Sequence, residues 1–131
     1  MPTSVKELLA AAHTAVPKIS HEEAQKLMAA GNVLVVDVRD GSEVEISGKV
    51  QSALHVSRGM LEFRADPDSP IHDSHFAKDK TIIVYCGTGG RAALSGKTLK
   101  DLGFADVRNL GSFKDWMESG RAIERGLDPS T

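Results

Sequence analysis

Residues 81–91 of the chain read Thr-Ile-Ile-Val-Tyr-Cys-Gly-Thr-Gly-Gly-Arg. The first five of these residues are mostly β-branched or aromatic, which is typical of a strand buried on both faces of a parallel sheet. Cys86 comes directly after them, followed by a glycine-rich turn. A helical pattern then runs over residues 91–102 and is closed by Gly103. The stretch therefore predicts a strand, a tight loop and a helix in direct succession.

Strand and helix patterns alternate along the rest of the chain. Residues 33–38 form a second buried strand pattern, and weaker ones occupy 53–56 and 106–108. Strands that alternate with helices predict an α/β domain with a mainly parallel central sheet flanked by helices. The remaining helices are predicted after two capping boxes, Ser4-x-x-Glu7 and Ser20-x-x-Glu23, and over residues 58–64 and 112–118, whereas residues 66–79 are predicted as mostly loop.

Residues with ionisable or nucleophilic side chains stand at the ends of the two strongest strand patterns. Asp37 stands near the end of the first pattern, and Cys86 follows the second. Because ligands of parallel α/β sheets bind beyond the carboxyl ends of the strands, both residues are expected at the site. Asp37 is interpreted mainly as a supporting group that accepts loop hydrogen bonds or pairs with Arg39.

The sequence of the loop after Cys86 predicts an anion-binding site. Glycines let successive peptide N–H groups turn inward at a helix N-terminus, where the helix dipole adds to their effect. Such N–H groups stabilise a thiolate, which is the nucleophilic form of cysteine. Arg91 carries a permanent charge and a planar set of donors suited to an oxyanion. The predicted site consists of Cys86 as nucleophile with Gly87, Thr88, Gly89, Gly90 and Arg91 as substrate-binding residues.

Composition narrows the class of protein. The chain has 131 residues, 16 of them basic and 18 acidic, so its formal net charge is −2. This balance gives no reason to expect nucleic acid or a membrane as partner. The single cysteine allows no intrachain disulfide and favours a reducing, cytoplasmic location. One domain is expected over residues 19–125, with an N-terminal helical extension over 1–18 and a C-terminal tail over 126–131.

The motifs around Cys86 resemble those of single-domain members of the rhodanese family. The family's loop reads Cys-x-x-Gly-x-Arg followed by Ser or Ala, which Cys86, Gly89, Arg91 and Ala92 match. Two further motifs occur in the family's order: Asp37-Val38-Arg39, and Gly111-Ser112-Phe113-x-x-Trp116. The resemblance covers about residues 19–124 and implies a three-layer rhodanese-like domain.

Two departures from the family pattern bear on the site. The family commonly reads Gly-His-Ile-Pro-Gly-Ala where this chain has Gly48-Lys49-Val50-Gln51-Ser52-Ala53. Many family members that use thiosulfate also place a basic residue just after the cysteine, whereas Gly87 and Thr88 stand here. The second departure leaves the physiological sulfur donor open.

The resemblance implies a sulfurtransferase that works by double displacement. Cys86 would take a sulfane sulfur from thiosulfate or a similar anion, carry it as a persulfide, and pass it to cyanide, a thiol or a protein acceptor. Arg91 would orient the donor's sulfonate, and no metal or organic cofactor is required. The extra helical residues before Ser20 leave two roles open, a homodimer contact or a cover for the sheet.

Other functions compete with this one. Rhodanese domains also serve as persulfide carriers or regulatory binding modules in sulfur pathways. Some phosphatases and arsenate reductases share the fold, but their loops hold one more residue between cysteine and arginine than the four found here. Sulfur transfer is therefore the preferred hypothesis.

Several other residues are expected to be mainly structural. Arg39 is expected to be an ion-pair partner, and Lys49 is expected at the surface. His55 and Arg58 close a predicted strand and could face the site, but a packing role is the preferred interpretation of His55. His72 and His75 lack a third metal ligand in register, and Phe113 and Trp116 are expected in the core.

Overall fold

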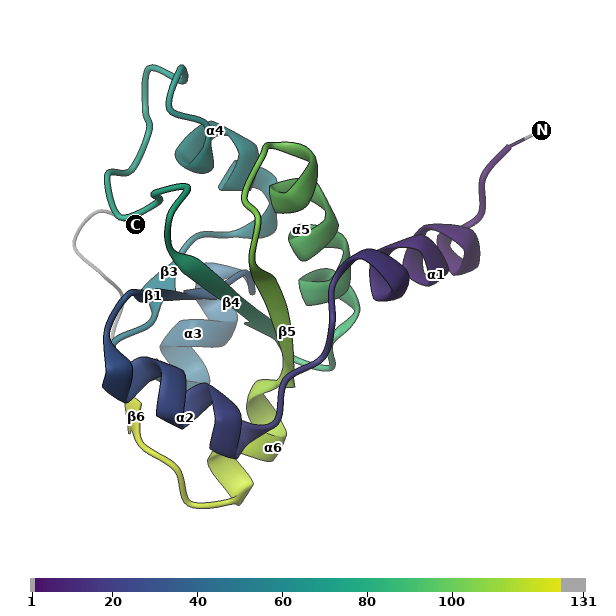
Figure 1. Cartoon of the computed structure of the whole chain (residues 1–131). Coiled ribbons are helices and arrows are strands. Elements are labelled where there is room, and N and C mark those ends of the chain that lie inside the picture. The colour runs from purple at the N-terminus through teal and green to yellow at the C-terminus, as the bar shows by residue number, and fades with distance from the viewer. Residues whose placement is uncertain (1, 126–131) are drawn as a thin grey trace.

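Four parallel strands form the sheet at the centre of the molecule (Figure 1). The computed structural model describes residues 2–125, so the predicted tail at 126–131 lies outside the described residues. The strand order is β3-β1-β4-β5, and every neighbouring pair is parallel. The strands are β1 (Val33–Asp37), β3 (Leu54–His55), β4 (Thr81–Cys86) and β5 (Val107–Ser112). The two strongest strand patterns of the sequence thus became the two inner strands.

Side chains of the inner strands alternate between two apolar cores, one on each face of the sheet. Leu34, Val36, Ile82 and Val84 point to one face together with Cys86. Their neighbours Val35, Ile83 and Tyr85 point to the other face. Because successive side chains of a strand point in opposite directions, a run that is apolar at every position needs cover on both faces.

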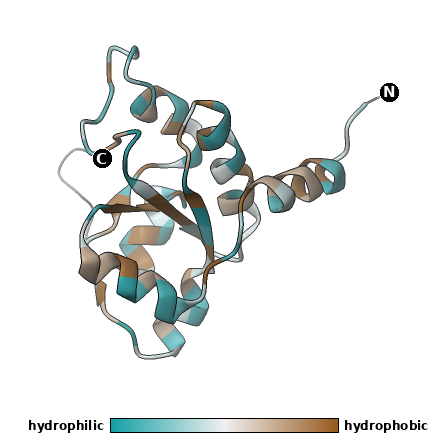
Figure 2. Cartoon of the chain, in the orientation of Figure 1, coloured by the Kyte–Doolittle hydropathy of each residue, from teal (hydrophilic) through white to brown (hydrophobic). Residues whose placement is uncertain are grey.

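Helices supply that cover. Residues of α4 (Leu61–Ala65) and α5 (Gly90–Asp101) pack into the core that holds Cys86, and residues of α2 (His21–Ala30) and α6 (Phe113–Glu118) pack into the other. A short 3-10 helix, η1 (Arg58–Met60), leads into α4. Figure 2 shows the apolar inner strands β1 and β4 between helices in which hydrophobic and hydrophilic residues alternate. This three-layer arrangement confirms the predicted fold class.

The helix α1 (Val5–Ala15) projects from the body and packs only by its C-terminal part (Figure 1). The predicted capping box forms, because the Ser4 hydroxyl accepts the Glu7 N–H at 3.1 Å. After the helix, Val16 enters the core that holds Cys86. A Cβ placed on Gly96 of α5 would lie only 2.9 Å from Val16 Cγ1. The absence of a side chain at Gly96 therefore permits this close approach.

Two features were not predicted. Residues 41–47 form a helix, α3 (Gly41–Ser47), immediately beyond the end of β1. Two short strands, β2 (Lys49–Val50) and β6 (Ile123–Glu124), pair as an antiparallel ribbon. Ser52, in the turn that follows β2, has a φ of 71°.

The prediction that Lys49 lies at the surface was wrong. Lys49 is 3% exposed, and its ammonium donates to the Ala53 carbonyl oxygen and to Glu124 Oε1. Pairing with β6 draws the residue inward, and the long side chain satisfies its charge there.

Candidate active site

The carboxyl ends of the inner strands bring the predicted residues together. Asp37 is in register with Tyr85, one residue before Cys86, and Cys86 is in register with Ser112. Parallel strands end at the same edge of the sheet, so Asp37 and Cys86 both lie there, as the sequence predicted.

Backbone N–H groups surround the Cys86 sulfur. Sγ accepts a hydrogen bond from the Gly89 N–H at 2.9 Å and another from the Ala92 N–H at 3.4 Å. Gly89 adopts a left-handed conformation with a φ of 109° as the N-cap of α5, which turns its N–H back toward the sulfur. These donors, at the positive end of a 12-residue helix, stabilise negative charge on the sulfur. Cys86 itself has no exposed surface.

The loop arginine is held by a residue that sequence reasoning missed. Arg91 Nη1 donates to Glu43 Oε1 at 2.6 Å, and Nη2 donates to Glu43 Oε2 at 3.0 Å. Both side chains are 38% exposed. The Arg91 hydrogen bond, partly opposed by burial, lowers the Glu43 pKa, and the same contact raises the Arg91 pKa.

A sequence signal for Glu43 exists. Asp40-x-x-Glu43 is a third capping box, and the Asp40 N–H donates to Glu43 Oε1 at 3.3 Å. The box predicts a helix at 41–47, but its partner across the site follows only from the tertiary structure.

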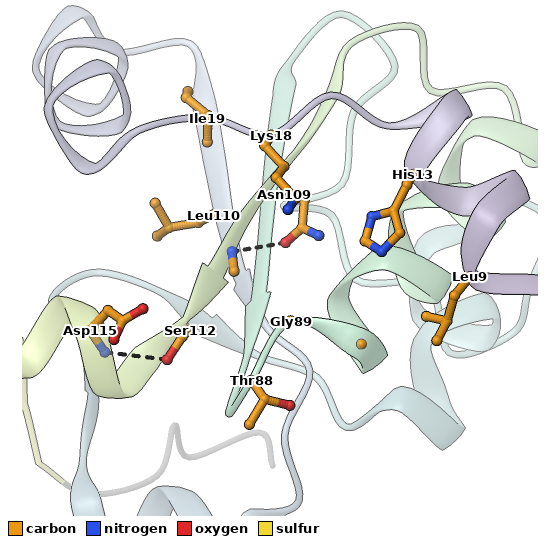
Figure 3. Close-up of a pocket in the computed structure, with 12 residues that line it drawn as sticks. Leu9, His13, Lys18, Ile19, Thr88, Gly89, Asn109, Leu110, Ser112 and Asp115 are labelled. Carbon is orange, nitrogen blue, oxygen red and sulfur yellow. Dashed lines mark hydrogen bonds between the residues drawn. The ribbon is translucent and has the colours of Figure 1, made fainter. Parts of the chain in front are cut away.

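The other loop residues lie against two different neighbours, the Arg91 side chain and a cavity. A Cβ on Gly87 would lie 3.2 Å from Arg91 Nη2, so the small residue lets the guanidinium lie against the loop backbone. Thr88 is exposed, and Thr88, Gly89 and Gly90 border a cavity of about 390 Å³ (Figure 3).

Asp37 and Arg39 form a buried ion pair next to the site. Arg39 Nη2 lies 2.8 Å from Asp37 Oδ2, and the Arg39 N–H donates to Asp37 Oδ1 at 2.9 Å. Arg39 also donates to the Gly48 carbonyl oxygen at 2.6 Å and lies over the Phe113 ring. These contacts join β1, the turn at Gly48 and α6, so the pair holds the edge of the sheet together.

A family model for the rhodanese-like domain matches residues 20–119. The chain belongs to the rhodanese-like family. Relatives of this rhodanese-like chain include the thiosulfate sulfurtransferase GlpE of Coxiella burnetii, 30% identical over 100 residues that cover 76% of the chain and 85% of the relative. A sulfurtransferase of Allochromatium vinosum is 29% identical over 105 residues, covering 79% and 90%. These relatives support a sulfurtransferase role.

Two solved structures extend the likeness to nearly the whole rhodanese-like chain. The polysulfide-sulfur transferase homodimer of Wolinella succinogenes superimposes with a TM-score of 0.75 at 31% identity, covering 96% of this chain and 90% of its own. A Rhodopseudomonas palustris protein of unknown function, described as a possible tyrosine phosphatase, gives a TM-score of 0.84 at 35% identity, covering 95% and 99%.

His55 and Arg58 of this rhodanese-like domain serve the scaffold. His55 Nε2 lies 2.7 Å from the Arg39 carbonyl oxygen, and the His55 side chain is buried. Arg58 donates to Glu62 and to Thr98 at 3.0 Å each, which links η1 and α4 to α5. None of these bonds reaches the loop at residues 86–91.

The remaining candidates are also structural. His75 Nδ1 pairs with Asp73 Oδ1 at 2.6 Å, and residues 2–125 contain no cluster of three or more His, Cys, Asp or Glu side chains that could hold a metal. Phe113 and Trp116 are buried, as predicted. Within the same described range, every helix is too short or too polar to cross a membrane.

Proposed function

We propose that the chain is a sulfurtransferase that moves a sulfane sulfur from thiosulfate or a similar anion to an acceptor through a persulfide on Cys86. The observation that carries the proposal is the pair of N–H groups, from Gly89 and Ala92, directed at the Cys86 sulfur. Fixed donors of this kind stabilise negative charge on Sγ as thiolate and as leaving group.

The first step consumes the donor. The Cys86 thiolate attacks the outer sulfur of thiosulfate, a new S–S bond forms, and the donor's own S–S bond breaks. Sulfite leaves with the electron pair of the broken bond. The persulfide's terminal sulfur then carries the negative charge, and no external oxidant or reductant is needed.

Arg91 is suited to orient the donor's sulfonate even while it binds Glu43. Guanidinium has five N–H donors, and the two bonds to Glu43 use two of them. The remaining donors can meet an oxyanion, and Thr88 can add a hydroxyl. Glu43 fixes the plane of the fork, so less side-chain entropy is lost when the donor binds.

The buried position of Cys86 implies that the loop moves during turnover. A donor reaches a sulfur without exposed surface only if part of the loop shifts. Gly87, Gly89 and Gly90 make such a shift inexpensive, because glycine adopts backbone conformations closed to other residues.

Phosphate chemistry is the competing enzymatic function, favoured by the description of the Rhodopseudomonas palustris neighbour. Four residues separate Cys86 from Arg91, one fewer than in the phosphatase loops. A tighter loop suits a sulfur atom better than a tetrahedral phosphate. Assay of p-nitrophenyl phosphate hydrolysis beside sulfur transfer, on one preparation, distinguishes the two.

A persulfide carrier is the alternative within sulfur chemistry. A carrier loads Cys86 as the enzyme does but passes its sulfur rapidly to one protein partner and slowly to small molecules. Kinetics with both acceptor types separate the two. We place either activity in the cytoplasm, where a reducing environment preserves the single thiol.

We also propose that this chain forms a homodimer, because the polysulfide-sulfur transferase of Wolinella succinogenes is a homodimer. Light scattering of the purified protein tests it, and a mass of 14.0 kDa at all concentrations would contradict it.

Intact-protein mass spectrometry after thiosulfate treatment tests the mechanism directly. We expect a mass gain of one sulfur atom on Cys86, removed by a reductant or by cyanide, with thiocyanate formed in proportion. Cys86→Ser should show neither gain nor thiocyanate while keeping its circular dichroism spectrum. Sulfur transfer by Cys86→Ser at the wild-type rate would overturn the proposal.

A further inference from the structure

The cavity beside the catalytic loop is bounded by the N-terminal helix as well as by the family domain (Figure 3). Leu9 and His13 of α1 form one side, and the end of β5 from Asn109 to Ser112 forms another. Cys86 is not among the lining residues, but Gly89 is, and the Gly89 N–H binds the Cys86 sulfur. The residue whose N–H binds the sulfur therefore forms part of the cavity wall, and the cavity volume is in the range of small-molecule sites.

Opposite charges line opposite sides of this cavity. Lys18 lies on the segment after α1 that pairs with Asn109 of β5, whereas Asp115 belongs to α6, and Figure 3 shows Asp115 beside Ser112, away from Lys18. Within residues 2–125, neither Lys18 nor Asp115 takes part in a salt bridge. Both charges are thus available to a ligand.

Neutral hydrogen-bonding groups lie between the charges. The Asn109 side-chain oxygen accepts the Gly111 N–H at 2.8 Å, which orients the amide and leaves its Nδ2 hydrogens to face the side of His13 (Figure 3). The Thr88 hydroxyl lies at the loop side. A carboxylate near Lys18 and Asn109, and an ammonium near Asp115, would both find complementary groups.

We propose that this cavity binds the sulfur acceptor, and that the acceptor is a small thiol bearing both a carboxylate and an ammonium group, such as cysteine or a short cysteine-containing peptide. This inference rests on the proposed sulfur transfer. It gives α1 a role in acceptor selection, since α1 supplies one wall of the cavity.

The step at this site balances without a further reagent. The acceptor thiol loses its proton to solvent, and its thiolate attacks the terminal sulfur of the Cys86 persulfide. A new S–S bond forms on the acceptor while the bond to Cys86 Sγ breaks. The electron pair of the broken bond stays on Cys86, whose thiolate is again stabilised by the Gly89 and Ala92 N–H groups.

Single-turnover transfer from the persulfide form tests the selection of the acceptor. Rates are measured with cysteine, cyanide and 2-mercaptoethanol, the last being a thiol without charged groups. We expect the ratio of the cysteine rate to the cyanide rate to fall at least about threefold in Lys18→Gln and in Asp115→Asn. The ratio for 2-mercaptoethanol should not change. Lys114→Gln and Glu118→Gln, exposed charges on α6 that do not line the cavity, are the matched controls.

Binding of S-methylcysteine, which cannot accept sulfur, tests the site without turnover. We expect it to shift the backbone amide NMR signals of Lys18, Gly89 and Asp115 in the full chain. Unchanged rate ratios in both variants, or no shifts at tens of millimolar S-methylcysteine, would overturn the acceptor site. Binding of S-methylcysteine to a protein that never gains sulfur on Cys86 would support the site and overturn the proposed function instead.

Discussion

Glu43 and Arg91, 48 residues apart in the chain, meet through two hydrogen bonds of 2.6 and 3.0 Å beside the loop that follows Cys86. Arg91 lies in the first turn of α5, and Glu43 belongs to the short helix α3 beyond the end of β1. The carboxylate fixes the guanidinium but also cancels much of its charge. The site is therefore less attractive to a dianionic donor than a free arginine would make it.

Replacing Glu43 by Gln should lower the KM for thiosulfate. The variant keeps the shape of the side chain but removes the negative charge that competes for Arg91. We expect KM to fall about threefold or more in low salt, with a smaller effect in high salt because surface charges are screened. Steady-state thiosulfate:cyanide kinetics at two ionic strengths measure this.

Glu45→Gln is the control, since Glu45 is an exposed carboxylate on the same helix. An equal change of KM in Glu45→Gln would show a general field effect. A higher KM in Glu43→Gln would mean that the fixing of Arg91 by Glu43 outweighs the cancellation of its charge.

The Glu43–Arg91 pair should also make stability depend on pH. The Glu43 pKa is lowered in the folded state, so the pair contributes stability above the unfolded-state pKa and loses it as the pH falls through the lowered value. Since both side chains are 38% exposed, the contribution at neutral pH should be no more than about 1 kcal/mol. Urea unfolding of the wild type and of Glu43→Gln measures it.

The difference between the two unfolding free energies should begin to shrink as the pH falls below the ordinary glutamate pKa and should approach zero below the lowered pKa of Glu43. A difference that grows on acidification would show that the pair is not the cause.

Gly96→Ala should loosen the attachment of α1. The new Cβ would lie 2.9 and 3.0 Å from the two Val16 methyl carbons. We expect a net loss of about 1 kcal/mol, because the clash outweighs the helix-propensity gain of alanine. Chemical denaturation of Gly96→Ala, Val16→Ala and the double variant should show that the double variant loses less unfolding free energy than the two single variants lose together.

Gly59→Ala, where a Cβ meets nothing within 4 Å, is the control. Strict additivity would mean that the two residues do not compete for the same space.

The chain contains two Asp-x-Arg ion pairs of equal spacing, one buried and one exposed. Comparing them tests how much burial increases the effect of an ion pair on the free energy of unfolding. Asp37 and Arg39 are buried, whereas the side chains of Asp106 and Arg108 are 45% and 34% exposed. Asp37→Asn leaves the Arg39 charge buried without its carboxylate and should cost about 3 kcal/mol of unfolding free energy. Asp106→Asn should cost less than about 1 kcal/mol. Equal losses in thermal or urea unfolding would contradict a special role for the buried pair.

Most of the scaffold could be predicted because it depends on local patterns. Val33–Asp37 and Thr81–Cys86 are apolar at almost every position, which identifies strands covered on both faces. The two short strands of the antiparallel ribbon could not be predicted in this way. The strands Lys49–Val50 and Ile123–Glu124 pair only with each other, across more than seventy residues, and their sequences carry no strand pattern of their own.

The sequence by itself determined the α/β class, the position of Cys86 at a strand end, and a glycine-rich turn before a helix, since each depends on neighbouring residues. Only the tertiary structure decided what surrounds that loop. It turned the Gly89 N–H onto the sulfur, set Glu43 against Arg91, buried Lys49, and brought His13 and Lys18 into a cavity with Asp115. These contacts join segments far apart in the chain. Such partners are selected by packing and charge compensation in the folded state, which leave no periodic pattern in a single sequence.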